Sequence, residues 1–325
     1  MVVEQGVSER GVELWKGGVQ QSECDQMGHM NVAFYLAKAS EALGGLAAAL
    51  GLPRAFRAGG ETTLIIRDQH VRFLREAHFS APLLITGGIV ELEESDARVL
   101  MLLHHDDGSL AATFQLVVGH VDARTRGPRP WPQAVRSGAE QLRVEVPSAA
   151  AARSCTLDPV DPQRLSLERA LALDLPRTSL GLIQPGECDM FGRLRPEALL
   201  TRIFEGAVHL GKREPKEKRS FDPSAGLGGA AVEYRLVYFD LPAVGQLIEV
   251  RSGFSSVGPK VRHLVYWVLD VETGRACCLA DSVVVSFDLN TRKIITLEGE
   301  ALAAAQAAVV PGLELWATIS NGADV

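Results

Sequence analysis

Several groups that could do acid–base or nucleophilic chemistry lie within seven residues near the N-terminus. The segment DQMGHMN (25–31) contains a carboxylate, an imidazole and a side-chain amide around a glycine. An aspartate can attack a carbonyl carbon or take a proton from water, and a histidine can move a proton or orient a water. Asp25 is therefore the first candidate for nucleophile or general base, and His29 the second catalytic candidate.

The residues that follow predict a helix beginning at the end of this motif. The segment NVAFYLAKASEALGGLAAAL (31–50) is rich in Ala and Leu, with Asn31 suited to the N-cap and Gly51 to the stop. It is apolar around much of its circumference, which predicts a buried central helix. The first N–H groups of a helix are unpaired and its N-terminus is electropositive, so this end could serve as an oxyanion hole. Gly28 would allow a substrate to approach closely because it has no Cβ.

Each of these residues also has a structural interpretation. Asp25 could be a turn or capping aspartate, and His29 could only brace the loop. Asn31 could act as the N-cap alone or could also hold an attacking water. Tyr35, one turn further on, is interpreted as core packing.

The motif occurs twice in the chain. GGVQQSECDQMG (17–28) and GLIQPGECDMFG (181–192) are identical at six of twelve positions, 164 residues apart. The same offset pairs Glu41 with Glu205 and Leu46 with Leu210. Glu41 is a reserve catalytic candidate, although its repetition also fits a structural contact in both copies. The sequence therefore predicts an internal repeat.

Both halves show the same order of elements. A helix is predicted over 196–211, and each half continues with segments of strand character, the last two forming a hairpin with its turn at Asp107-Gly108 or near Thr273-Gly274. The predicted fold class is α+β, an antiparallel sheet packed against one long helix in each half. We expect an N-terminal domain over 1–135, a linker over 136–170, a second domain over 171–300, and a C-terminal helix and tail over 301–325.

The D-x-x-G-H-x-N pattern at the start of an Ala-rich helix resembles the 4-hydroxybenzoyl-CoA thioesterase-like group of the hotdog superfamily. In that fold a curled antiparallel sheet wraps around a central helix. The resemblance extends over nearly the whole chain, twice. The chain is therefore similar to double-hotdog thioesterases, whose two domains pair as an internal pseudo-dimer. Further homo-oligomers are compatible with it.

The resemblance implies hydrolysis of an acyl-CoA thioester to free acid and coenzyme A. Asp25 stands at the catalytic acidic position of the family, with Gly28, His29 and Asn31 around it. No cofactor is expected beyond coenzyme A as part of the substrate. The acyl group, and the choice between coenzyme A and an acyl carrier protein, stay open.

The second copy has lost part of the motif. Arg193 and Arg195 stand where the first copy has histidine and asparagine, and Pro196 removes a helix N–H donor. We therefore expect one catalytic copy and one structural copy. Arg193, Arg195 and Arg202, with the basic run 212–220, are candidates for binding the phosphates of coenzyme A. For 212–220 a solvated loop is an equal alternative.

Composition narrows the function classes. The formal net charge of −7 argues against a nucleic-acid partner, and no apolar run reaches the roughly 20 residues needed to span a membrane. The five cysteines have no disulfide or zinc-ligand spacing, so neither a disulfide framework nor a metal is expected. We expect a cytoplasmic protein with a small-molecule substrate.

Two alternatives remain. A non-catalytic acyl-thioester binding or sensing protein would retain the motif without turnover. A hotdog dehydratase or hydratase fits less well, because its D-x-N-x-x-H pattern places the histidine five residues after the aspartate. Here Asp25 and His29 are four residues apart, and Met27 occupies the asparagine position.

Overall fold

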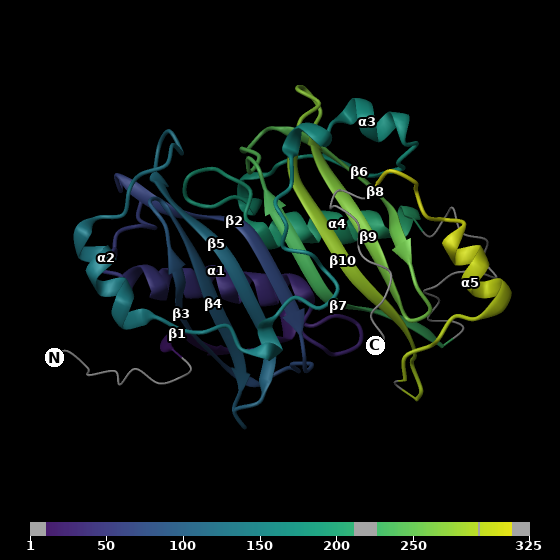
Figure 1. Ribbon diagram of the computed structural model, residues 1–325, viewed down its shortest axis with the longest axis horizontal. Coiled ribbons are helices and arrows are strands. Elements are labelled where there is room, and N and C mark those ends of the chain that lie inside the picture. Colours follow the sequence, from purple (N-terminus) through teal and green to yellow (C-terminus); the bar gives the residue numbers. More distant parts are fainter. Residues whose placement is uncertain (1–10, 211–225, 292, 314–325) are drawn as a thin grey trace. The chain divides into compact units, whose positions relative to one another are not determined.

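The computed structural model describes residues 11–210, 226–291 and 293–313 (Figure 1). The chain forms two compact units. One consists of Met1–Ala151 with Gln184–Thr201, and the other of Ala152–Ile183 with Arg202–Val325. The second copy of the motif therefore belongs to the first unit, although most of the second half of the chain belongs to the second.

The first unit contains a five-stranded antiparallel sheet and one long helix. The strand β1 (Val12–Gly18) precedes the helix α1 (Val32–Ala49), and four strands follow. These are β2 (Thr62–Phe73), β3 (Pro82–Leu92), β4 (Asp96–His105) and β5 (Leu110–Asp122). The strand order is β1-β3-β4-β5-β2, with every neighbouring pair antiparallel.

The second unit repeats this plan. Its strands are β6 (Arg177–Leu182), β7 (Leu227–Tyr238), β8 (Leu247–Val257), β9 (Val261–Asp270) and β10 (Ala276–Asp288). Their order, β6-β8-β9-β10-β7, is the counterpart of the order in the first unit. The long helix α4 (Pro196–Leu210) lies between β6 and β7 in sequence. The α+β hotdog fold predicted for both halves is thus confirmed.

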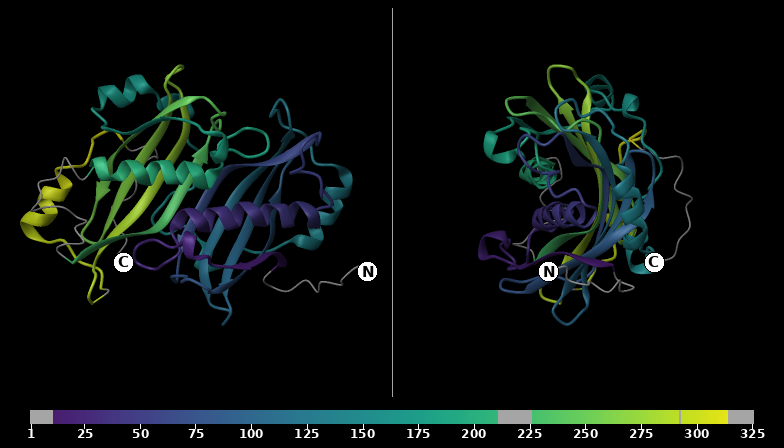
Figure 2. Two further views of the ribbon diagram at one scale, coloured as in Figure 1. Left: turned by 180° about the vertical axis from the view of Figure 1, so that it is seen from behind. Right: turned by 90° about the vertical axis from the view of Figure 1, so that its left-hand side faces the viewer.

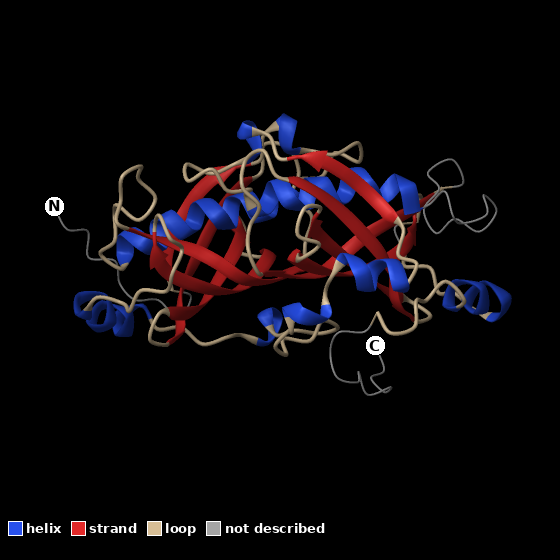
Figure 3. Cartoon of the chain, turned by 90° about the horizontal axis from the view of Figure 1, so that it is seen from above, coloured by secondary structure: helices blue, strands red, loops and turns tan. Residues whose placement is uncertain are grey.

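The helix α1 lies along one face of the curled sheet of its unit, as Figures 2 and 3 show. Its apolar side chains form the core of the layer, with Leu36, Ala39 and Leu46 at most 1% exposed. Gly45 is needed for this packing, because a Cβ there would collide with the main-chain carbonyl of Leu14 in β1. This close approach holds α1 against β1.

Shorter helices lie between and after the main elements. They are α2 (Gln133–Ala139), α3 (Leu167–Ala172) and α5 (Gly299–Gln306), with 3₁₀ turns η1 (Gln21–Glu23), η2 (Glu140–Leu142), η3 (Ser148–Ala150), η4 (Pro162–Arg164) and η5 (Pro185–Glu187). The segment predicted as a linker packs against the sheets. Ala150 packs on Leu100 and Leu102 in the first unit, and Leu165 packs on Trp267 in the second.

A buried polar network anchors the start of this segment in the second unit. Glu233 accepts hydrogen bonds from the N–H groups of Arg153 and Ser154, and Arg235 donates to the carbonyls of Thr156 and Asp158. Each charged group, about 2% exposed, therefore binds main-chain partners that replace water.

All five cysteines are free thiols. Within the part of the chain that the structure describes, no helix is long and apolar enough to cross a membrane.

Candidate active site

Asp25 organises the tight loop between η1 and α1. Its Oδ1 accepts hydrogen bonds from the N–H groups of Met27 at 2.8 Å and His29 at 3.3 Å. The main chain closes the loop from Asp25 N–H to His29 O, and from Gly28 N–H to Asp25 O. Oδ2 accepts no hydrogen bond from the described residues, and the side chain is exposed. The loop thus holds the carboxylate in one orientation with one oxygen available.

Gly28 serves the backbone of this loop. Its φ of +77° lies in the left-handed region that disfavours a side chain. A Cβ at this position would meet no heavy atom within 4 Å. The close-approach role predicted for Gly28 therefore stays a prediction, whereas the turn itself is sufficient reason for the glycine.

The second copy of the motif folds in the same way. Asp189 Oδ1 accepts hydrogen bonds from Phe191 N–H at 2.8 Å and Arg193 N–H at 3.0 Å, and Gly192 has a φ of +73°. The shared aspartate and glycine therefore account for loop shape in both copies. Any chemical difference between the copies must come from the other residues.

Asn31 satisfies most of the free donors at the start of α1. Its Oδ1 accepts a hydrogen bond from Ala33 N–H at 3.0 Å, which confirms the predicted N-cap, and its carbonyl accepts one from Phe34 N–H. The N–H of Val32, the first helical residue, donates no hydrogen bond within the described residues. Of the main-chain donors predicted to form an oxyanion hole at this helix end, the N–H of Val32 is therefore the one that is available.

In the second copy this donor is missing. Pro196 is the first residue of α4 and lies 164 residues after Val32, the offset of the repeat. Proline is well suited to this position of a helix, but it has no N–H.

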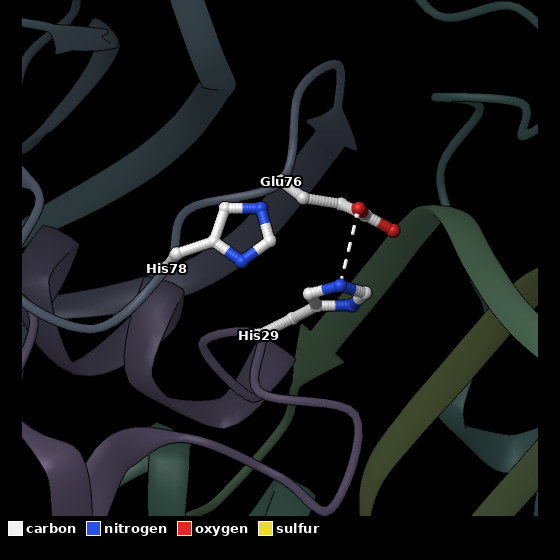
Figure 4. Close-up of side chains that lie close together, drawn as sticks. All are labelled: His29, Glu76 and His78. Atoms are coloured by element: carbon white, nitrogen blue, oxygen red, sulfur yellow. Dashed lines mark ion pairs between the residues drawn. The ribbon is translucent and has the colours of Figure 1, made fainter.

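The structure brings two further side chains to the motif, Glu76 and His78 (Figure 4). His29 Nε2 lies 3.3 Å from Glu76 Oε2, and the rings of His29 and His78 meet edge to face with centroids 4.8 Å apart. The histidine is mostly buried, with its side chain 18% exposed, whereas that of Glu76 is 51% exposed. The carboxylate of Glu76 can balance the positive charge of the imidazole when His29 is protonated.

Main-chain contacts fix the segment that carries Glu76 and His78. His29 and His78 form an antiparallel bridge, and Met30 N–H donates to Ala77 O at 2.7 Å. Ala77 N–H donates in turn to the Tyr35 hydroxyl at 3.1 Å. Burial raises the pKa of Tyr35 to about 12, so this hydroxyl stays neutral at physiological pH. Tyr35 is core packing, as predicted, and also positions the residue between Glu76 and His78.

Sequence reasoning missed Glu76 and His78. They lie 47 and 49 residues after His29, in an irregular segment beyond β2. The ends of β2 and β7 show which residues of the second copy correspond to them. Leu74 and Arg75 both donate to Ala111 O, just as Phe239 and Asp240 both donate to Cys277 O. This correspondence makes Leu241 the counterpart of Glu76 and Ala243 that of His78, so the second copy has neither group.

Glu41 has a structural partner. Its Oε2 accepts the indole N–H of Trp15 at 2.5 Å, which ties α1 to β1. The neighbouring Lys38 pairs with Glu23 at 2.8 Å and lies over the Trp15 ring. The hydrogen bond from Trp15 gives Glu41 a structural role, and its catalytic role stays a prediction.

The three arginines proposed to bind phosphates have different surroundings. Arg195 donates to the carbonyls of Gly186 and Glu187, and Arg202 donates to Leu182 O at 2.9 Å. Lys38, which lies 164 residues before Arg202, makes the same contact with Gly18 O at 3.2 Å. Arg202 therefore has a structural role shared by both copies. Arg193 is half-buried, and the basic run 212–220 lies outside the described residues.

The first unit is thus a hotdog fold. At the start of its central helix lie the carboxylate of Asp25, an imidazole next to a second carboxylate, and one N–H donor. Residues 19–138 match the family described as the thioesterase-like superfamily. A comparison with curated protein sequences finds no match to the chain.

Solved structures with the same fold extend over most of the chain. A protein assigned as an oleoyl thioesterase from Lactobacillus plantarum is 11% identical with a TM-score of 0.63, over 89% of this chain and 98% of that one. A 12:0-ACP thioesterase from Umbellularia californica is 11% identical with a TM-score of 0.60, over 84% and 93%. An acyl-ACP thioesterase from Bacteroides thetaiotaomicron is 10% identical with a TM-score of 0.59, over 83% and 96%. At these identities the likeness establishes the fold.

Proposed function

We propose that the protein hydrolyses an acyl-CoA thioester to the free acid and coenzyme A, and that only the first copy of the motif is catalytic. This proposal rests mainly on one observation: His29 Nε2 lies 3.3 Å from Glu76 Oε2, next to the Asp25 loop. The match of residues 19–138 to the thioesterase-like superfamily supports the reaction class.

Asp25 supplies the carboxylate that acts on the thioester carbonyl. In a direct route, Oδ2 bonds to the carbonyl carbon, the C–S bond breaks, and the leaving thiolate takes a proton from His29. Water then cleaves the resulting anhydride, giving a proton back to His29 and restoring Asp25. In a water route, Asp25 takes a proton from a water whose oxygen attacks the carbonyl carbon. The C–S bond then breaks, and the leaving thiolate takes that proton from Asp25, which restores the carboxylate.

In both routes the carbonyl oxygen becomes negatively charged. The N–H of Val32, at the positive end of α1, is the main-chain donor available to it. Glu76 balances the charge of His29 whenever the imidazole carries the proton. Borohydride reduction of protein quenched during turnover separates the routes, because only the direct route forms an acyl–aspartyl anhydride.

An apolar acyl group fits the exposed side chains near the motif. Met27, in the Asp25 loop, is 42% exposed, and Phe79, next to His78, is 57% exposed. Large apolar side chains open to solvent beside polar groups are a common feature of binding sites for apolar ligands. Arg193, Arg195 and Arg202 are candidate contacts for the phosphates of coenzyme A.

The proposal is tested by following release of free thiol from short, long, branched, hydroxylated and aromatic acyl-CoAs. The same acyl groups on an acyl carrier protein form a second series, which identifies the carrier. Glu76→Gln, which keeps the shape but removes the charge, should lower kcat by about 10²- to 10⁴-fold. Saturable binding of thioesters without turnover of any of them would instead support a sensing protein.

A further inference from the structure

His29, Glu76 and His78 form a group of metal-ligating side chains. One ligand atom from each of them lies within 4.8 Å of those of the other two. Figure 4 shows the two imidazoles and the carboxylate converging from the Asp25 loop and from the segment after β2. No metal-ligand spacing is visible in the sequence, because the ligands lie on segments 47 residues apart.

The main chain holds these segments in register. The bridge between His29 and His78 and the hydrogen bond from Met30 N–H to Ala77 O join them directly. Glu76 and His78 are two residues apart, and a ligand atom of each lies within 4.8 Å of one of His29. The backbone of the site is therefore in place before any ion binds, and only side-chain rotation is needed.

The donor set selects the kind of ion. Two imidazole nitrogens and one carboxylate oxygen suit zinc and neighbouring first-row transition metals, whereas Mg²⁺ and Ca²⁺ prefer oxygen ligands. We propose that His29, Glu76 and His78 bind one divalent transition-metal ion of the zinc class.

The closing movement that this requires is small. Ligand atoms about 2.0–2.1 Å from a tetrahedral zinc ion lie roughly 3.4 Å apart. The His29–Glu76 distance of 3.3 Å already meets this value. His78 is exposed, so its ring can rotate to complete the set. Three protein ligands leave the fourth position open to water.

Metal binding and hydrolysis compete for the same groups. A bound ion takes the imidazole of His29 and the carboxylate of Glu76, which the proposed reaction needs for proton transfer. Zinc therefore inhibits hydrolysis reversibly, a consequence that rests on the proposed function. The binding site itself does not depend on it.

The second copy lacks all three ligands. Arg193 stands in place of His29, and the counterparts of Glu76 and His78 are Leu241 and Ala243. Within the described residues, the group of His29, Glu76 and His78 is the one set with ligand atoms this close. The expected stoichiometry is thus one ion per chain.

Binding is tested by titrating chelator-treated full-length protein with Zn²⁺ against a chromophoric chelator, and with Co²⁺ followed by visible absorption. Wild type should bind one ion with the absorption of a tetrahedral site. His78→Ala should weaken binding on the order of 100-fold, because one of three ligands is lost. His209→Ala, which removes an exposed histidine of α4, is the matched control. Equal affinity of wild type and His78→Ala would overturn the proposal.

Inhibition is measured on the same proteins. Zn²⁺ should inhibit thioester hydrolysis by wild type and by His209→Ala, but not by His78→Ala, when each protein is compared with its own rate in the absence of metal. Binding at the site with no effect on hydrolysis would refute the roles of His29 and Glu76 while leaving the metal site standing. If the protein binds no Zn²⁺ and Glu76→Gln still abolishes hydrolysis, the metal site is refuted and the proposed function stands.

Discussion

Val32 and Pro196 occupy the same position in the two copies of the repeat, each as the first residue of the central helix. Only Val32 has an N–H to donate, and that donor is free of hydrogen bonds within the described residues. The two copies keep the same aspartate-centred loop and differ in this donor and in the groups around it. The two copies therefore share the loop conformation but not the groups proposed to take part in the reaction.

The oxyanion donor can be removed with little change to the fold. Val32→Pro places proline at the first helical position, where it is well tolerated. The preceding Asn31 already has φ −63° and ψ 141°, the extended conformation that a following proline requires. We expect kcat to fall by about 10²- to 10³-fold, with little change in the unfolding temperature.

Val32→Ala keeps the N–H and is the control for loss of the valine side chain. Stopped-flow or steady-state thiol release compares the two variants with wild type. If Val32→Pro and Val32→Ala are equally active, the donor has no role in the reaction.

Tyr35 acts as a positioning residue. Tyr35→Phe removes the acceptor of the buried Ala77 N–H and should lower the free energy of unfolding by about 1–3 kcal/mol. Because Ala77 lies between Glu76 and His78, kcat should fall more than KM changes. Both quantities are measured, by chemical denaturation and by steady-state kinetics.

Tyr266→Phe is the matched control in the second unit. Tyr266 is 3% exposed, and no hydrogen bond of its hydroxyl occurs within the described residues. This substitution should leave kcat unchanged. A normal kcat in Tyr35→Phe as well would contradict the positioning role.

The helices and strands could be predicted from the sequence because their patterns are local. The helix expected over 31–50 is α1 (Val32–Ala49), and the helix expected over 196–211 is α4 (Pro196–Leu210). Hydrophobic periodicity, an N-cap and a stop signal are sufficient for such elements. The predicted hairpin turns also occur, with Gly108 and Gly274 at positive φ.

The site could be predicted only in part. Asp25, Gly28, His29 and Asn31 form a contiguous motif, so their proximity needed no knowledge of the fold. Glu76 reaches His29 only through the bridge between two irregular segments, a tertiary contact that no local pattern encodes. Glu41 fits both a catalytic and a structural interpretation in the sequence, and the structure supplies its partner, Trp15.

The buried pair His263–Asp281 makes the stability of the second unit depend on pH. Nδ1 of the histidine lies 3.1 Å from a carboxylate oxygen. Burial lowers the pKa of His263, but the hydrogen bond and charge of Asp281 outweigh it and raise the pKa overall. The stabilisation is therefore complete below the unfolded pKa of about 6.5 and is lost as the pH rises through the folded value.

Chemical denaturation of wild type and Asp281→Asn between pH 6 and 9 measures this effect. Wild type should be more stable at low pH, and its advantage over Asp281→Asn should shrink as the pH rises. An advantage that stays constant over this range would rule out a proton-linked contribution from His263.

The most direct test of a single catalytic copy compares Asp25→Asn with Asp189→Asn. An amide oxygen can accept the two loop N–H bonds that Oδ1 accepts now, so both variants should keep their loops while losing one carboxylate. The measurement is kcat/KM for thiol release from the preferred acyl-CoA. We predict a loss of about 10²- to 10⁴-fold in Asp25→Asn and wild-type activity in Asp189→Asn. Loss of activity in Asp189→Asn with retention in Asp25→Asn would contradict the account.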